Sequence, residues 1–116
     1  MKIVGKKWGM EEIIVNNSLY CGKILYLKKG IKSSIHYHKE KDETFFVLEG
    51  EVILELFGGI YHELPDKTLI LKKGDSHRLL PGQIHRFYTM NNKAKFLEIS
   101  THHSEEDTIR LKERKV

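Results

Sequence analysis

The middle of the chain is a series of short apolar segments with alternating polarity, separated by turn-forming residues. In residues 51–57, the side chains of Val52, Leu54 and Leu56 fall on one face of an extended chain and the intervening side chains on the other. The Gly-Gly pair at 58–59 then indicates a hairpin turn. By the same criteria, the sequence predicts strands over residues 23–29, 43–49, 51–57, 67–73, 84–90 and 94–100.

Residues 103–114 are the one segment whose pattern favours a helix. Ser104 can cap its start, acidic residues fill its first turn and basic residues its last, which complements the helix dipole. Many short strands and one short C-terminal helix predict an all-β fold, either a β-sandwich or a barrel-like jelly roll. A length of 116 residues suits a single domain over residues 1–116.

The formal net charge of +4 raises the question of nucleic-acid binding. Lysine pairs at 6–7, 28–29 and 72–73 are spread along the chain and interleaved with glutamates, without a basic helix or a basic–aromatic alternation. We therefore expect a solvated basic surface that attracts small anions, and no nucleic-acid partner.

The chain contains no apolar run close to the roughly 20 residues that span a bilayer, and its start lacks the apolar core of a signal peptide. We expect no membrane association and a cytoplasmic location. Cys21 is the only cysteine, so it has no partner for an intrachain disulfide or a thiolate metal site. The sequence predicts that it is a small core residue.

A cluster of ionisable residues lies next to segments that are predicted to form buried strands. His36 and His38 are one residue apart, and Glu43 opens the hydrophobic segment that follows. Residues i and i+2 of a strand share a face, roughly 6–7 Å apart, so both imidazoles can reach one ion. Glu43 can add an oxygen from the next strand, which leaves coordination positions open for water or substrate.

A third histidine occurs in the second half of the chain. His85 begins an apolar strand directly after the Pro81-Gly82 turn. A polar ring that enters a core strand needs a partner to offset its desolvation, and a metal ion is such a partner. Arg86 follows His85 and should therefore face outward.

The spacing of the first cluster resembles the first motif of the cupin superfamily. Gly30, His36, His38, Glu43 and Gly50 match that motif at every position, in its variant with four residues before the glutamate. The strand pattern is also similar to that of the family. The resemblance implies the cupin double-stranded β-helix, a jelly-roll barrel.

The segment around His85 resembles the second cupin motif. Gly74, Pro81, Gly82 and His85 match it, although the proline is next to the glycine and Thr89 stands where asparagine is frequent. In cupins the histidines and the glutamate of the two motifs bind one divalent metal inside the barrel. The resemblance therefore implies four metal ligands: His36, His38, Glu43 and His85.

Both ends of the chain resemble the type II mannose-6-phosphate isomerase cupins. The segment KKWGMEEIIV is similar to their opening, with Lys7 replacing a proline, and STHHSEEDTIRLKE is similar to their closing segment. Those isomerases often have glutamine where His36 stands, and their closing tyrosine-glycine-arginine is absent. Lys41 matches a basic position that is linked there to sugar phosphates.

This resemblance implies a metal-dependent aldose–ketose isomerase that acts on a sugar phosphate. A divalent metal (Zn, Mn, Fe or Ni) would polarise the substrate oxygens while a base moves a proton between two carbons. The candidate catalytic residues are Glu43 and Lys41. The base is either a Glu43 that releases the metal or a hydroxide on the metal. Lys41 would attract the phosphate, or would instead form a surface pair with Glu40 or Asp42.

Two other functions fit the same residues. A non-catalytic cupin that binds a sugar or a sugar nucleotide is favoured by the missing C-terminal arginine. An iron-dependent dioxygenase is favoured because three histidines and a glutamate with open positions also suit oxygen chemistry. The identity of the metal distinguishes these functions, since oxygen uptake with iron would indicate the dioxygenase.

Three further features bear on assembly and on the pocket. Several apolar strands with few residues to cover their edges predict a homodimer. Trp8 either covers the barrel or packs on a dimer partner. His102 and His103 belong to the start of the predicted helix or form a surface metal site.

Overall fold

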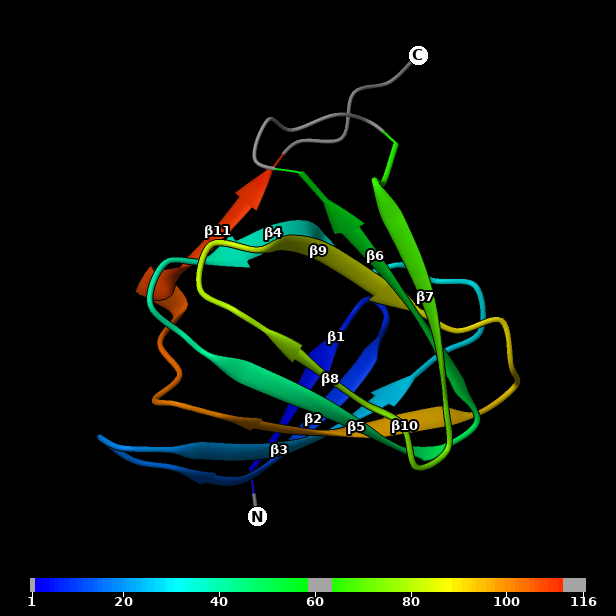
Figure 1. The fold of residues 1–116 in the computed structure, drawn as a ribbon. Helices are drawn as coiled ribbons and strands as arrows, with labels where there is room; N and C mark the ends of the chain where they lie inside the picture. Colours follow the sequence, from blue (N-terminus) through cyan, green and yellow to red (C-terminus); the bar gives the residue numbers. More distant parts are fainter. Residues whose placement is uncertain (1, 59–63, 112–116) are drawn as a thin grey trace.

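The computed structural model describes residues 2–58 and 64–111, which form two antiparallel β-sheets that face each other (Figure 1). In the larger sheet the strand order is β1-β2-β3-β10-β5-β8, and in the smaller it is β11-β4-β9-β6-β7. The strands are β1 Lys2–Lys6, β2 Gly9–Asn16, β3 Cys21–Leu27, β4 Ile35–His38, β5 Glu43–Glu49, β6 Glu51–Phe57, β7 Lys67–Lys72, β8 Ser76–Leu79, β9 Ile84–Tyr88, β10 Ala94–Ser100 and β11 Thr108–Leu111.

The predicted all-β fold is confirmed, and each of the six predicted strands is present. β5, β6 and β10 have the predicted bounds, whereas β3 begins two residues earlier and β7 and β9 end sooner. β6 pairs with β7 in the antiparallel sense that a hairpin requires. Gly59 of the predicted turn lies outside the described residues.

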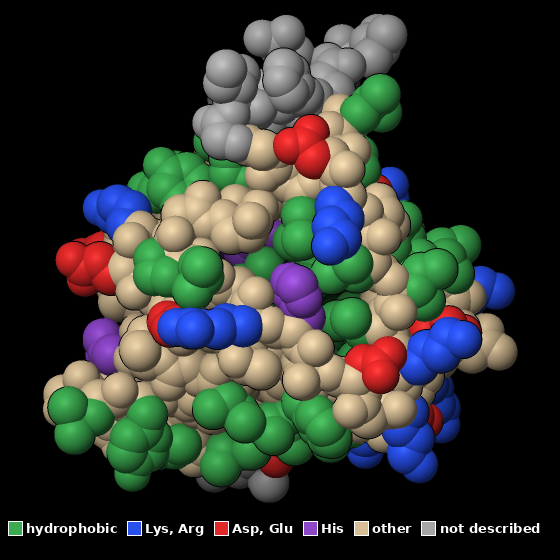
Figure 2. Space-filling model, viewed as in Figure 1, with side chains coloured by type: hydrophobic (Ala, Val, Ile, Leu, Met, Phe, Trp, Pro, Cys, Tyr) green, Lys and Arg blue, Asp and Glu red, His purple; other side chains and the backbone are tan. Residues whose placement is uncertain are grey.

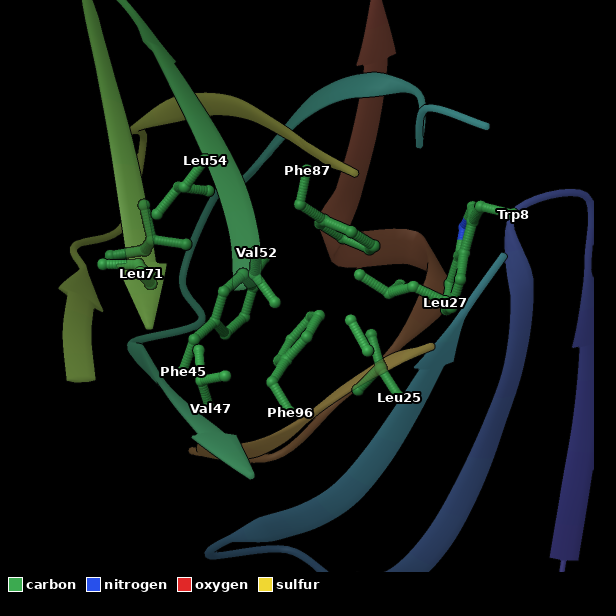
Figure 3. Packing of buried hydrophobic residues seen from close by; sticks show 12 residues of the cluster. Trp8, Leu25, Leu27, Phe45, Val47, Val52, Leu54, Leu71, Phe87 and Phe96 are labelled. Carbon is green, nitrogen blue, oxygen red and sulfur yellow. The ribbon is translucent and has the colours of Figure 1, made fainter. Parts of the chain in front are cut away.

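The hydrophobic core fills the space between the sheets because alternate side chains of facing strands point inward. Figure 3 shows the rings of Phe45, Phe87 and Phe96 directed toward one another. The centroids of Phe45 and Phe96 are 4.4 Å apart, and those of Phe87 and Phe96 are 5.2 Å apart. Trp8 packs edge-on against Phe87 at 5.1 Å, so it covers one end of this core. Cys21 is buried, as predicted.

The predicted helix over residues 103–114 is wrong for its described part. Glu105–Asp107 form a single 3₁₀ turn, and Ser104 makes no side-chain capping bond to it. Thr108–Leu111 then form β11, which pairs with β4 and aligns Leu111 with Ile35. Pairing with the edge of β4 outweighs the helical charge pattern, since it satisfies the backbone groups of both strands. No helix in residues 2–58 and 64–111 is long and apolar enough to cross a membrane.

Arg86 lies on the opposite face of β9 from His85 but is buried there. Its guanidinium pairs with Glu55, the residue opposite it in register on β6, at 2.6 Å between Arg86 Nη2 and Glu55 Oε1. Both residues are less than 10% exposed. Arg86 therefore points away from His85, as predicted, but it is in a buried ion pair and not in solvent.

The outer face of the larger sheet carries apolar side chains in contact with solvent. Phe46 on β5 is 37% exposed and Ile99 on β10 is 54% exposed. These two strands are neighbours in the sheet. Figure 2 shows hydrophobic side chains gathered along the lower edge of the molecule, where Figure 1 places this sheet.

We expect Phe96→Ala to destabilise the protein by about 3–5 kcal/mol, because it leaves a cavity between the sheets. The control is Tyr20→Ala, which removes an aromatic ring from a position that is 54% exposed and should cost less than about 1 kcal/mol. Chemical denaturation of both variants measures the difference. Equal losses of stability would contradict the assignment of Phe96 to the core.

Candidate metal centre

Strand pairing brings three histidines together at one end of the barrel. On β4, Ile35 and Tyr37 pack on the outer side of the smaller sheet, so His36 and His38 point inward. The antiparallel pairing of β4 with β9 places His36 directly opposite His85. One ring nitrogen from each of the three histidines lies within 4.8 Å of the others, and all three side chains are buried.

Each imidazole is held by a partner at Nδ1, which leaves its Nε2 available. The Nδ1 partners are Ser34 O at 2.8 Å for His36, Gln83 O at 2.8 Å for His85 and Thr108 Oγ1 at 3.1 Å for His38. A carbonyl only accepts hydrogen bonds, so it fixes the Nδ1–H tautomer of His36 and His85. Outer partners of this kind orient the histidine ligands of metal ions.

Glu43, the first residue of β5, reaches the same point from the opposite sheet. Its Oε2 lies 3.2 Å from His38 Nε2 and 3.6 Å from His85 Nε2. Glu43 Oε1 and His85 Nε2 are buried and have no hydrogen-bond partner among the described residues. Buried polar atoms without partners cost free energy, and a cation between them would remove that cost. The three histidines therefore form a cluster that could hold a metal ion, with the carboxylate of Glu43 beside it.

The protonation states of the buried rings suit metal binding. Burial lowers the pKa of His36 to about 3, and the nearby His85 adds to the effect. Burial likewise lowers the pKa of His85 to about 4. Both rings are therefore neutral at neutral pH, and neutral imidazole is the form that coordinates metals.

Lys41 lies beside Glu43 but does not reach the surface. Its ammonium is 2.6 Å from Glu98 Oε2, 3.7 Å from Glu43 Oε1 and 3.1 Å from His103 Nδ1. Burial alone would lower the pKa of Lys41, but the carboxylates of Glu98 and Glu43 outweigh it and raise the pKa. Lys41 is therefore a buried cation, and it pairs with neither Glu40 nor Asp42.

Three more residues complete this end of the barrel: Glu98 and Lys23, for which the sequence predicted no role, and His103, which was expected at the start of a helix or in a surface metal site. Glu98 and Lys23 are buried and lie opposite each other in the register of β10 and β3. His103 accepts the hydrogen bond from Lys41, and burial followed by the charge of Lys41 lowers its pKa to about 4. Period-two alternation could have identified the first two, since Lys23 shares a face with Leu25 and Glu98 with Phe96.

Part of the cluster faces a cavity of about 470 Å³. His36, His38 and Glu43 line it together with the charged residues Lys23, Lys41 and Glu98. The turn between β1 and β2 and strand β11 also contribute side chains to its wall. A metal ion bound by the histidines would therefore face a space large enough for a small ligand.

The chain belongs to the cupin domain family: the Cupin_2 family model matches residues 23–100. These residues contain both motifs and all four candidate ligands. The assignment confirms the cupin superfamily, and the two facing sheets fit its double-stranded β-helix.

One curated protein has a sequence similar to part of this chain. The chain is 29% identical over 79 residues to the uncharacterized protein YdbB of Bacillus subtilis (strain 168), a match that spans 67% of this chain and 60% of that protein.

Two solved structures resemble the fold. KdgF from Halomonas sp. has a TM-score of 0.70 at 14% identity, over 84% of this chain and 81% of that one. The capsular polysaccharide assembling protein CapF from Staphylococcus aureus has a TM-score of 0.76 at 15% identity, over 96% of this chain and 31% of that one.

We expect His38→Ala to remove most of the bound metal while the protein stays folded, because the hydrophobic core does not depend on this ring. Loss of an outer partner alone typically weakens metal affinity by about 10–100-fold, and loss of a ligand should exceed that. His102→Ala is the control, since His102 is exposed and, within residues 2–58 and 64–111, its side chain bonds only the carbonyl of Asn17. Elemental analysis measures both. One metal per chain in His38→Ala would refute the assignment.

Proposed function

We propose that this cupin is a metal-dependent isomerase that interconverts an aldose phosphate and a ketose phosphate of the mannose-6-phosphate type. One observation carries the proposal: His36 and His38 of the three-histidine cluster line a cavity together with Glu43 and further charged side chains. A cavity of this kind holds a small polar molecule next to a metal ion. The similarity in fold to CapF, a capsular polysaccharide assembling protein, agrees with a sugar ligand.

His36, His38, His85 and Glu43 would hold one divalent ion, either zinc, manganese, iron or nickel. When bound, it supplies a Lewis acid that polarises hydroxyl and carbonyl oxygens. Three nitrogen donors and one oxygen donor suit all four metals, so the donor set does not choose among them.

Glu43 is the proposed catalytic residue, and Lys41 is the proposed residue that positions it. In the isomerisation the hydrogen on carbon 2 moves to carbon 1 and the hydroxyl hydrogen on oxygen 2 moves to oxygen 1, so no other reactant is needed. Glu43 Oε2 lies among the imidazoles while Oε1 is directed toward Lys41, 3.7 Å away. The carboxylate of Glu43, which lines the cavity, would accept the proton from carbon 2 and return it to carbon 1. Lys41 would hold the carboxylate in position by charge.

A second candidate function is the non-catalytic binding of a sugar or a sugar nucleotide. It is favoured by the way Lys41 is held between Glu98 and Glu43, since an ammonium in a tight ion pair is a poor carrier of protons. Under this alternative the cavity binds its ligand and leaves the ligand unchanged.

Isomerase activity is tested with mannose 6-phosphate and protein loaded separately with each of the four metals. We expect formation of the ketose phosphate, its loss on chelation, and a decrease of at least about 10²-fold in Glu43→Gln. Metal content measured on the same samples separates loss of the ion from loss of the base. Saturable binding without turnover would favour the binding function, and oxygen uptake with iron would favour a dioxygenase.

We also propose that the protein is a homodimer whose interface includes the exposed apolar side chains on the outer face of the larger sheet. Light scattering at micromolar concentration should give twice the mass of one chain, and Ile99→Lys should reduce it to that of one chain. Ile70→Lys is the control, because Ile70 is similarly exposed on β7 of the other sheet. A wild-type monomer would contradict the proposal.

A further inference from the structure

The cavity next to the metal centre carries an excess of positive charge. Six basic and four acidic side chains line it, a surplus of two positive charges before any metal is bound. The basic ones are Lys6, Lys7, Lys23, Lys32, Lys41 and Arg110, and the acidic ones are Glu11, Glu43, Glu98 and Glu105. A bound divalent ion would add two more positive charges, so the cavity favours a ligand with negative charge.

Several of these cations already have partners. Lys41 is paired with Glu98 at 2.6 Å, and Arg110 Nη2 is 3.1 Å from Glu105 Oε2. The ammonium of Lys32 lies 4.8 Å from the centre of the Tyr88 ring. Lys41, which the sequence suggested for a phosphate, is therefore already engaged by protein carboxylates.

Lys23 is the buried cation with donors to spare. It is 1% exposed and lies on the same face of β3 as Leu25. Among residues 2–58 and 64–111, its only hydrogen-bond or ion-pair partner is Glu11, at 3.5 Å from Nζ to Oε2. An ammonium has three N–H donors, and a buried donor without an acceptor costs free energy. An anionic oxygen in the cavity would supply the missing acceptor.

Lys6 and Lys7 extend this positive charge along the cavity wall. Both stand where β1 turns into β2, next to Trp8, and neither has an ion-pair partner among the described residues. The charges from the β1–β2 turn and from β3 therefore belong to one wall of the cavity, while the imidazoles come from β4 and β9 of the other sheet. A ligand with an anionic group at one end and a metal-binding group at the other would match this arrangement.

We propose that Lys23, Lys6 and Lys7 form a subsite for the phosphate group, or another dianionic group, of the ligand. This proposal rests on the proposed function in one respect, which is that the other end of the ligand binds at the metal centre. Lysine binds phosphate as a point charge, without the fixed fork geometry of arginine. Lys41 is then a positioning residue that holds Glu43 and Glu98 in place.

Binding is measured by calorimetry on metal-loaded protein with mannose 6-phosphate, mannose and inorganic phosphate. We expect mannose 6-phosphate to bind at least tenfold more tightly than mannose, and inorganic phosphate to compete with it. Lys23→Met and the double variant Lys6→Gln/Lys7→Gln should each weaken mannose 6-phosphate binding at least tenfold at low salt, with smaller effects at high salt.

The control is the double variant Lys93→Gln/Lys95→Gln, which removes the same charge near a different surface depression. It should bind mannose 6-phosphate like the wild type. Equal affinities for mannose and mannose 6-phosphate, or wild-type affinity in the Lys6/Lys7 variant, would overturn the subsite. If Lys23→Met does not fold, the Lys6/Lys7 variant decides alone, since these side chains lie at the surface turn.

Turnover is recorded separately, so that the two proposals fail independently. Lysine-dependent binding of mannose 6-phosphate without isomerisation supports the subsite and refutes the isomerase. Equal isomerisation of mannose and mannose 6-phosphate refutes the subsite and leaves a sugar isomerase. Absence of any binding of sugar phosphate or inorganic phosphate overturns the subsite.

Discussion

The carboxylate of Glu43 is buried between two sheets, and the need to compensate its charge organises one end of the barrel. The Glu43 side chain is 2% exposed, so water cannot solvate it, and burial of an uncompensated carboxylate would cost several kcal/mol. Lys41 partly offsets this charge, but the ammonium is closer to Glu98 than to Glu43. The remaining compensation is what a cation among the imidazoles would provide. The metal centre and the ion pairs behind it are in this sense one electrostatic unit.

Along four strands, the inward-facing residues are polar at one end of the barrel and apolar at the other. On β3 the inward residues run from Lys23 to Leu25, and on β5 from Glu43 to Phe45. On β9, His85 is followed by Phe87 on the same face. On β10 the order is reversed, and Phe96 is followed by Glu98. Because antiparallel register places Glu98 opposite Lys23, and Phe96 opposite Leu25, the polar positions meet at one end and the apolar positions at the other. The apolar end gives the stability against which the buried charges are held.

The sequence predicted the parts of this arrangement that follow from local pattern. Strong alternation located β5, β6 and β10, and the spacing of His36, His38 and Glu43 indicated their convergence. β1 and β2 were not predicted, because side chains such as Ile3 and Ile14 remain exposed on them and give no clear inward face. β11 was mistaken for a helix because its acidic start resembles a helix N-terminus, whereas pairing with β4, a tertiary interaction, determines its structure. Alternation could have placed Lys23 on the inward face, but its pairing with Glu98 across β3 and β10 depends on register. The contact between His103 and Lys41 joins residues far apart in the sequence, so local pattern alone could not assign it.

The central claim is that three imidazoles and the carboxylate of Glu43 bind one divalent ion. X-ray absorption spectroscopy of the metal-loaded protein tests it most directly, because scattering through imidazole rings reports how many histidines bind the ion. We expect three imidazoles with additional oxygen ligands and no sulfur ligand. A spectrum with one imidazole or none, or with a sulfur ligand from Cys21, would contradict the claim.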